Sequence, residues 1–522
     1  MDLFLSVLPI LLVLFLLIFA KKTADVAGLV GWVATALIAI VYFKTSFDVV
    51  LKSSIMGFLA ALPVSLVVVT SILQLNVMES AGAMKRIIVF VKGLSKDDKV
   101  FQALILNVGF GTFLAATGAV PVTVLPPILI GLGYSTFAAI ALSAVGFDAL
   151  CTYALLGTPL VVFSQIANVD LITSARYFLP FVGVVSFTIS LAMLFIIGNS
   201  KFVKRGFVPA IIVGLTSYAA AELAILVKAP VITGIFAGIL IMLVMMAILK
   251  LLGKRVYDSS HFTEEDRKVE KTMGIIKATS PWILLVVFIL ITNLITPIRE
   301  FLYDKLSMPV EVMKGPKIKP IFTRVIWQSY TWILLSTIIS IFIFKMNGKE
   351  LKSVWEKTKS RIPKPFWSST VFFLMAYVMM YSGYQKTSNG YELLQKTHNI
   401  VYVLAEYSAK GFKNAYAFVA PYLGILGGFI TGTETSTVAM FAKYTIETSN
   451  LLGLSPLLMV AAVAFGGGLA SGISPSKLQN AAAAIDAIGQ ESKVLRTTLI
   501  ISLIMAFVTG IISFLLRGYT IH

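Results

Sequence analysis

Very few side chains in the apolar parts of this chain can carry a charge. An ionisable side chain at the centre of a bilayer costs about 2.5–3.5 kcal/mol on insertion scales, so each one found there is a candidate functional group. A carboxyl group removed from water is disfavoured in its charged form, which suits a group that binds and releases a proton. The ionisable residues of the apolar stretches are Asp148, Glu434, Lys443, Glu447, Lys477 and Asp486.

Two of these carboxylates, Asp148 and Glu434, lie where long apolar runs are interrupted. We predict that Glu434, with Asp148 as the second candidate, binds a coupling proton. Protonation removes the repulsion towards an incoming anion, so proton and substrate binding become linked. The alternative is that both are structural carboxylates held in ion pairs, with Lys477 as the partner of Asp148.

Threonine, serine and glycine gather at the same interruptions. The N-terminus of a half-helix presents unpaired N–H groups and the positive end of the helix dipole, and both suit a carboxylate. The alternative is that these small residues only permit close packing and kinks, as in many membrane helices. The predicted anion-binding residues at the two interruptions are Thr117, Gly118, Thr431, Gly432, Thr433, Thr435 and Ser436.

The composition of the whole chain indicates a membrane protein. Of 522 residues, 58% are hydrophobic and only 13% are charged, whereas soluble domains contain about a quarter charged residues. The net charge of +18 is divided by aliphatic runs, which argues against a continuous nucleic-acid surface and favours the lipid bilayer as partner. The single cysteine, Cys151, excludes a disulfide framework and a Cys-rich metal site, and the three histidines lack metal-ligand spacing.

Most apolar runs have the length of a simple transmembrane helix, which needs about 20 residues. The first run precedes Lys21 and Lys22 and has no basic residues before it, so we expect a retained helix and not a signal peptide. Residues 250–277, 299–324 and 345–364 are expected to be connectors or interfacial helices, and 384–413 an amphipathic arm at the membrane surface. The expected spans are 2–20, 25–43, 53–76, 178–198, 207–227, 231–249, 279–297, 325–344, 366–383 and 497–516.

Two further stretches, 101–166 and 415–489, are apolar but too long or too interrupted for simple helices. If each makes one net crossing, 26 basic residues lie on one side of the membrane and 15 on the other. The side richer in Lys and Arg is the cytoplasmic one. We therefore predict a multi-pass protein of the cell membrane with both termini external.

These two interrupted stretches resemble each other. Each match is weak alone, but four in the same order are hard to attribute to chance. Under the predicted topology the copies enter the membrane from opposite sides, which makes them inverted repeats, an arrangement typical of secondary transporters. The matched pairs are 132–141 with 452–461, 117–124 with 431–438, 157–159 with 473–475, and 80–82 with 382–383.

The predicted fold is an all-α polytopic membrane protein with two inverted repeats. Each repeat contains a re-entrant hairpin and a broken transmembrane helix, because helix-breaking loops at membrane depth must be buried in protein or line a cavity. The expected organisation is a first repeat at 1–198 (hairpin 101–131, broken helix 136–166), linking helices and a cytoplasmic loop at 199–278, and a second repeat at 279–522 (hairpin 415–449, broken helix 455–489).

The residues around both interruptions resemble the lactate permease family, transporters of lactate and glycolate within a superfamily of elevator-type carriers. The resemblance covers patches from about 100 to 170 and from 375 to 500, and is strongest in the second half. Its motifs are Phe110-Gly-Thr-Phe-Leu114, the run 161–170 with Gln165 and Asp170, the run 420–432 followed by Thr435-Ser436, Ile473-Ser-Pro475, and Gly489-Gln-Glu-Ser492.

Several positions depart from the family pattern, and they concern the substrate and the coupling ion more than the fold. Ala115-Ala116 stands where Glu-Gly is common, and Phe147-Asp-Ala-Leu150 replaces an Asn-Thr-Ala-Pro run. Glu434 occupies an Asn or Asp position before Thr-Ser, and Val438 occupies an Asn position. The lysine common before Ile-Ser-Pro is absent, while Lys477 lies just beyond it.

The resemblance implies a transporter with scaffold and transport domains, an elevator motion and a homodimer. It also implies a 2-hydroxycarboxylate substrate, whose hydroxyl is expected to reach Thr152, Thr158 or Ser474. Lys477 either pairs with the substrate carboxylate or is a structural or snorkelling lysine.

The predicted function is proton-coupled symport of a small 2-hydroxymonocarboxylate such as L-lactate, with glycolate and D-lactate as alternatives. No cofactor or metal is expected beyond the coupling ion, H⁺ or alternatively Na⁺, and the absence of a G-x-x-x-x-G-K-[ST] motif argues against ATP as the direct driver. A sodium-coupled carboxylate carrier is the next candidate, and an anion channel a further one, because re-entrant loops also line pores. An enzyme or a non-transporting receptor is the most distant alternative.

Overall fold

The chain folds almost entirely into apolar helices. The computed structural model describes residues 1–94, 98–260 and 262–521, without the side chains of Asp148 and Ala149. Within these residues nine helices are long and apolar enough to cross a membrane. The structure therefore confirms the predicted helical, multi-span character of the chain.

The first part of the chain ends in a long interrupted helix. That helix, α10, has non-helical backbone at Gly198 and Asn199, which separates it into two spans. The elements are α1 (Asp2–Ile18), α2 (Ala24–Val41), α3 (Phe47–Ser80), α4 (Ala83–Lys92), α5 (Lys99–Ala103), the π-helical η1 (Leu104–Phe110), α6 (Gly111–Ala116), α7 (Pro121–Gly131), α8 (Thr136–Val145), the 3₁₀ turn η2 (Asp148–Tyr153), α9 (Ala154–Ala167) and α10 (Leu171–Leu226).

The second part contains shorter elements. Helices α14 and α15 continue into η4 with a bend of 88° at Ile295, where a single straight span over 279–297 was expected. The elements are η3 (Pro230–Ile232), α11 (Thr233–Leu251), α12 (Glu264–Thr272), α13 (Ile275–Ala278), α14 (Ser280–Leu294), α15 (Thr296–Glu300), η4 (Phe301–Lys305), β1 (Met308–Val310), β2 (Ile321–Thr323), α16 (Ser329–Phe344), α17 (Gly348–Arg361), α18 (Pro363–Tyr381), β3 (Tyr384–Thr387), β4 (Gly390–Leu393), η5 (Lys396–His398), α19 (Ile400–Phe412), η6 (Lys413–Ala415), α20 (Tyr416–Thr431), α21 (Glu434–Leu452), α22 (Pro456–Leu469), η7 (Ala470–Ile473), α23 (Pro475–Ala483) and α24 (Glu491–Leu515).

Four of the helix breaks in the two interrupted stretches have local features that account for them. Pro121 begins α7 and Pro475 begins α23, at the first helical position, where the missing N–H group costs nothing. Gly432 ends α20 in the left-handed conformation. In the broken helix after η2, Leu155 has a left-handed backbone together with its two successors, Leu156 and Gly157.

Two short antiparallel hairpins interrupt the helical pattern, β1–β2 and β3–β4. The second lies within 384–413, so the expectation of one amphipathic arm is wrong for residues 384–393, and only the later part of that segment forms the helix α19. Strands of three or four residues are too short to give a clear alternating pattern. The local signal is Asn389-Gly390, a dipeptide typical of tight hairpin turns.

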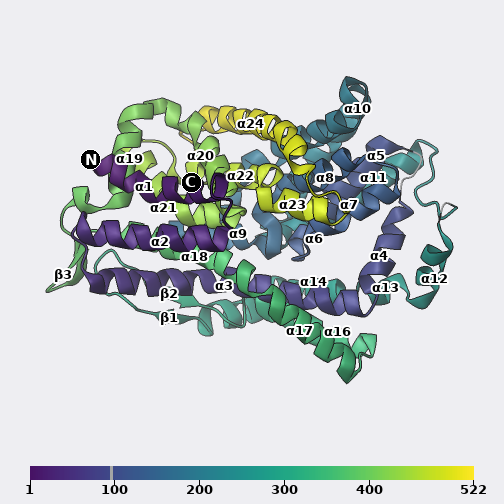
Figure 1. Cartoon of the computed structure of the whole chain (residues 1–522), viewed down its shortest axis with the longest axis horizontal. Coiled ribbons are helices and arrows are strands. Elements are labelled where there is room, and N and C mark those ends of the chain that lie inside the picture. Colours follow the sequence, from purple (N-terminus) through teal and green to yellow (C-terminus); the bar gives the residue numbers. More distant parts are fainter. Residues whose placement is uncertain (95–97, 261, 522) are drawn as a thin grey trace.

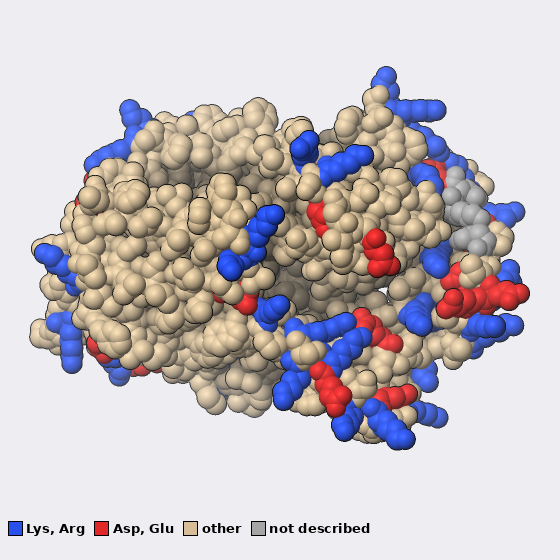
Figure 2. Space-filling model, in the orientation of Figure 1, with Lys and Arg blue, Asp and Glu red and all other residues tan. Residues whose placement is uncertain are grey.

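The helices are arranged side by side along one common direction (Figure 1). The N-terminus, β3 and α19 lie at one end of the molecule, the C-terminus lies in the same half, and α12 and α13 lie towards the other end. Figure 2 shows a broad surface with few charged residues in the left part of the view, while Lys and Arg gather towards the end that carries α12 and over α17. This distribution is expected of a protein whose apolar belt faces lipid.

Glycines allow two pairs of helices, α3 with α18 and α20 with α22, to approach until their backbones are close to each other. On α3, a Cβ at Gly57 would lie 2.7 Å from the carbonyl oxygen of Phe373 on α18, and Ser65 Oγ is 2.8 Å from Ser369 Oγ of the same helix. Between α20 and α22, a Cβ at Gly424 or Gly466 would overlap backbone oxygens of the facing helix. We call this second contact the glycine seam.

Candidate functional site

Glu434 joins the second interrupted stretch to the first. It is the first residue of α21 and is 4% exposed. Thr152, which is fully buried in η2, donates a hydrogen bond of 2.6 Å to Glu434 Oε1. A carboxylate is favoured at a helix N-terminus by the unpaired N–H groups and the dipole. The predicted proton-binding and substrate-binding residues Glu434 and Thr152 are therefore in direct contact.

The turn between α20 and α21, residues 431–434, is called the second tip below. Its threonines close the turn: Thr431 Oγ1 donates to the carbonyl oxygen of Thr433 at 2.9 Å, and Thr433 Oγ1 accepts from the N–H of Ser436 at 3.2 Å. Gly432 has φ +74°, and a Cβ there would find Ser474 Oγ at 3.6 Å. The second tip thus faces the break before α23, while Thr435 and Ser436 are buried behind it.

A second group of polar atoms lies between the two broken helices. Lys477 Nζ donates a hydrogen bond to Ser471 Oγ and lies 5.4 Å from the centre of the Phe147 ring. The Ser471 hydroxyl is also 3.8 Å from the sulfur of the buried Cys151. Lys477 therefore lies between Ser471 of its own broken helix and Phe147, which precedes η2 in the other one. Its predicted partner Asp148 begins η2, but the side chain of Asp148 lies outside the described residues.

The turn between α6 and α7, residues 117–120, is called the first tip below. Thr117 Oγ1 donates to the carbonyl oxygens of Phe113 and Leu114, at 3.0 and 3.1 Å, so its hydroxyl is used within its own helix. Gly118 has φ +90°, and a Cβ there would overlap Ser71 Oγ on α3. The first tip is therefore packed against α3.

The structure brings some of the predicted residues together and separates others. Thr152 contacts Glu434, and Gly432 faces Ser474, so the second tip meets both broken helices. Thr158, by contrast, donates to the carbonyl oxygen of Leu155 at 2.5 Å and has no other partner among the described residues, and the first tip points to α3. The residues that the sequence argument missed are the hydroxyls Ser471 and Ser476, which lie next to the recognised Ile-Ser-Pro motif.

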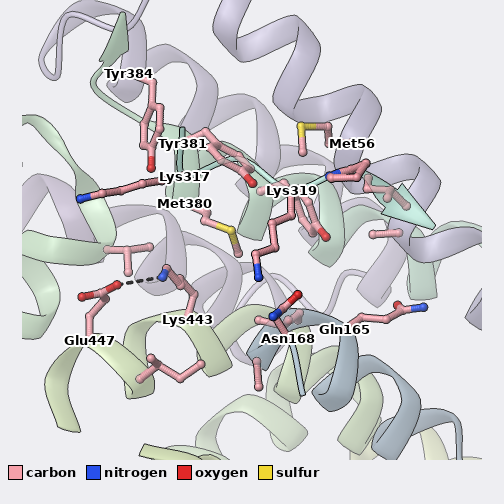
Figure 3. Close-up of a pocket in the computed structure, with 18 of the residues that line it drawn as sticks. Met56, Gln165, Asn168, Lys317, Lys319, Met380, Tyr381, Tyr384, Lys443 and Glu447 are labelled. Atoms are coloured by element: carbon pink, nitrogen blue, oxygen red, sulfur yellow. Dashed lines mark ion pairs between the residues drawn. The ribbon is translucent and has the colours of Figure 1, made fainter. Parts of the chain in front are cut away.

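A cavity of about 890 Å³ lies apart from the contact of Glu434 with Thr152 (Figure 3). It is bounded by the end of α9, by α18 and α21, and by the segments that carry the two hairpins. Gln165 and Asp170 of the 161–170 motif line it, as do Lys443 and Glu447, which form an ion pair of 2.8 Å. The ionisable residues of α21 therefore belong to two different places, Glu434 to the buried contact and this ion pair to the cavity.

Asp170 has a structural role at the edge of this cavity. Its Oδ1 accepts hydrogen bonds from the N–H groups of Ile172 and Thr173, both at 2.9 Å, and so caps α10. Burial raises the pKa of Asp170, but the hydrogen bonds from Thr173 and Ile172 outweigh it and hold the pKa below its ordinary value. Asp170 is thus held in its charged form at neutral pH by its own helix.

Comparisons with known proteins agree with these features. The family model described as L-lactate permease matches residues 2–519. An L-lactate permease of Escherichia coli (strain K12) is 27% identical over 97% of this chain and 94% of its own length, and the glycolate permease GlcA of the same strain is 26% identical over 98% and 95%. The solved structure of Neisseria gonorrhoeae MtrF has a TM-score of 0.44 and 13% identity over 91% of this chain and 84% of that one, a likeness too weak to assign a fold.

Proposed function

Because the chain belongs to the L-lactate permease family, we propose that it is a proton-coupled symporter of a small 2-hydroxymonocarboxylate, with L-lactate as the leading substrate and glycolate or D-lactate as alternatives. Membership of a permease family makes it a transporter and not an enzyme. The relatives named as lactate and glycolate permeases, matched over nearly their full length, support this substrate class.

The observation that carries the proposal is the buried hydrogen bond of 2.6 Å from Thr152 to Glu434. It links a titratable group on one hairpin to the broken helix of the other stretch. Protonation of Glu434 removes a negative charge beside the second tip, so an anionic substrate binds more readily to the protonated carrier. When the proton is released on the other side of the membrane, Glu434 regains its negative charge, and the anionic substrate is released on that side.

The second tip is the proposed binding place for the substrate carboxylate. The N-terminal end of α21 and the hydroxyls of Ser474 and Ser476 offer donors there. Lys477 contributes positive charge from the neighbouring break. The 2-hydroxyl group of the substrate is assigned to Ser474 or Thr152, since these two hydroxyls lie close to the second tip and to Glu434 respectively.

We assign the motion to an elevator-type exchange between two inverted repeats, 1–198 and 279–522, joined by 199–278. The helix breaks on either side of η2 and η7 support this assignment. The broken helices and hairpins form the transport domain, and the remaining helices form a scaffold and the interface of a homodimer. The orientation in the cell membrane follows from the charge bias, with both termini outside.

Coupling to Na⁺ is a second candidate, favoured by the oxygen atoms at the second tip. The carbonyl oxygen of Thr433 accepts from both Thr431 and Thr437, each at 2.9 Å, and Ser474 Oγ and Ser476 Oγ are 3.2 Å apart nearby. Clustered hydroxyl and carbonyl oxygens are ligands that suit a hard cation.

Reconstituted protein distinguishes the candidates. Proteoliposomes are loaded without substrate, and uptake of labelled L-lactate is followed under an inward H⁺ gradient, an inward Na⁺ gradient, or neither. Accumulation above the external concentration with H⁺ alone is expected. Accumulation with Na⁺ alone selects the second candidate. Equilibration that never exceeds the external concentration indicates a channel, and no uptake of any 2-hydroxymonocarboxylate overturns the assignment.

A further inference from the structure

The two hairpins form a fixed structure on top of α3. Residues 308–323 and 384–393, called the cap below, are joined by the N–H of Tyr391, which donates to the carbonyl oxygen of Lys314 at 2.8 Å. The Tyr391 hydroxyl donates to Asp48 on α3 and accepts a hydrogen bond of 2.6 Å from Lys52. Lys52 and Asp48 are also 3.1 Å apart as an ion pair. The cap is therefore tied to the end of α3 through charged groups.

The cap presents two lysines on a stiff loop. The sequence Pro316-Lys317-Ile318-Lys319-Pro320 connects β1 to β2, and proline restricts the backbone at both ends. Ile318 is buried in a cluster with Val49 and Met56 of α3, and its N–H donates to the carbonyl oxygen of Gly315 at 3.0 Å. Anchoring Ile318 in this way fixes the backbone from which Lys317 and Lys319 extend.

The other cations of the cavity have partners. Lys443 pairs with Glu447, Arg324 lies 4.1 Å from the ring centre of Tyr303, and Lys396 lies 5.1 Å from that of Tyr402. Among the residues that the structure describes, Lys317 and Lys319 form no ion pair, hydrogen bond or ring contact. Figure 3 shows Lys319 reaching down from the cap towards Asn168, with Lys317 extending past Tyr384. Two uncommitted positive charges thus face the space between the cap and α21.

The carboxylates around the cavity do not cancel these charges. The lining contains three carboxylates, Asp170, Glu392 and Glu447, against five Lys and Arg side chains, and Glu447 pairs with Lys443. Glu392 has its Oε2 3.5 Å from Thr387 Oγ1 on the same hairpin. A concave space with excess charge of one sign and low-dielectric walls concentrates ions of the opposite sign.

We propose that this cavity is an anion-binding vestibule, in which Lys317 and Lys319 hold the carboxylate of a small monocarboxylate before it reaches the second tip. The inference rests on the proposed function for the identity of the anion. The 890 Å³ volume exceeds what a three-carbon acid fills, so the bound anion keeps part of its water. The vestibule raises the local concentration of substrate and is separate from the proton-binding group at Glu434.

The first test measures binding without transport. Purified full-length protein is treated with an amine-acylating reagent, and modification of each lysine is followed by mass spectrometry. L-lactate is expected to slow acylation of Lys317 and Lys319 several-fold relative to lactamide, its uncharged analogue, at equal ionic strength. Lys314 serves as control because it belongs to the same connection but pairs with Glu311 at 2.8 Å and does not line the cavity. Equal rates with lactate and lactamide at all three lysines overturn the vestibule.

The second test measures uptake in proteoliposomes. The double variant Lys317→Gln/Lys319→Gln is expected to raise the KM for lactate by about tenfold at low ionic strength and to lose most of the salt dependence of uptake, with Vmax retained. Lys314→Gln is expected to behave like the unmodified chain. If the double variant transports lactate with unchanged KM and salt dependence, the vestibule proposal is overturned and the proposed transport function is not.

The two failures remain distinct. If the unmodified chain takes up no 2-hydroxymonocarboxylate, the proposed function fails, and protection of Lys317 and Lys319 still decides whether the cavity binds carboxylates. Protection by chloride equal to that by lactate assigns the site to small anions in general and overturns the carboxylate assignment.

Discussion

The two hairpin tips contain the same Thr-Gly pair and use it differently. At the first tip, Thr117 returns its hydroxyl to its own helix, and Gly118 rests on Ser71 of α3. At the second tip, Thr431 closes the turn, Gly432 faces the hydroxyls of Ser474 and Ser476 without overlap, and the buried Glu434 follows two residues later. The same Thr-Gly pair therefore forms a packing contact at the first tip and a polar turn beside a carboxylate at the second tip.

The sharpest test of this comparison is Glu434→Gln, which keeps the size of the side chain and removes its charge change. We expect proton-driven lactate uptake to fall by roughly a hundredfold or more, because the group that takes up the proton is lost. Uptake into proteoliposomes under an imposed pH gradient measures the effect. The control is Glu406→Gln, a carboxylate of α19 that pairs with Lys410 at the surface. Normal proton-driven uptake by the Glu434 variant would falsify its role.

The next effect concerns stability at the first tip. Gly118→Ala places a Cβ on Ser71 and forces a left-handed backbone on alanine, at a cost of about 2 kcal/mol or more. Gly432→Ala meets only the backbone cost of about 1 kcal/mol, since its methyl group would touch Ser474 Oγ and Ser476 Oγ at ordinary contact distances of 3.6 and 3.7 Å. Apparent melting temperatures in detergent should rank the variants in this order.

A double variant checks the cause of that loss. Ser71→Gly removes the atoms that the new methyl group would meet. The double variant Gly118→Ala/Ser71→Gly should therefore be less destabilised than the sum of the two single variants. Strict additivity would show that the first tip does not press on α3.

Thr152→Val tests whether the carboxylate depends on the other interrupted stretch. Valine has nearly the same shape and cannot donate the 2.6 Å hydrogen bond to Glu434. A hydrogen bond to a charged group contributes about 1.5–3 kcal/mol, so Vmax/KM for lactate should fall by about tenfold or more. Thr158→Val is the matched control, since its hydroxyl bonds only within its own segment. Equal behaviour of the two variants would remove Thr152 from the site.

The smallest effect distinguishes the two threonines of the tips. Thr431→Val removes a hydrogen bond of 2.9 Å that closes the second tip, and the KM for lactate should rise by about threefold. Thr117→Val removes a hydroxyl that only returns to its own helix carbonyls, and the KM should stay within about twofold. If neither variant changes substrate affinity, the carboxylate binds elsewhere.

The membrane-spanning helices could be predicted because length and apolarity act locally. Runs of about 20 apolar residues gave the spans, and Pro121, Pro475 and the Thr-Gly pairs indicated the interruptions. The hairpins of the cap could not be predicted, because Met308–Val310 and Tyr384–Thr387 are too short for a visible alternation.

The contacts of the site depend on tertiary structure. Thr152 and Glu434 are 282 residues apart, and nothing in either local sequence states that they meet. The same holds for the contact of Gly118 with Ser71. Gly118 and Gly432 both follow a threonine, and the sequence does not show that only Gly118 is packed tightly against another helix. Residue types therefore indicate which groups could carry chemistry, and tertiary packing decides which of them lie together.

The glycine seam between α20 and α22 has a mechanical consequence. Backbones in direct contact leave no rotatable side chain between them, so this joint has almost no compliance. If α20 moves, α22 should move with it, together with η7 and the helix break at Ser474. The distance between Gly432 and Ser474 should therefore stay nearly constant when the molecule changes conformation. Conformational change should occur instead at helix contacts that are filled by side chains.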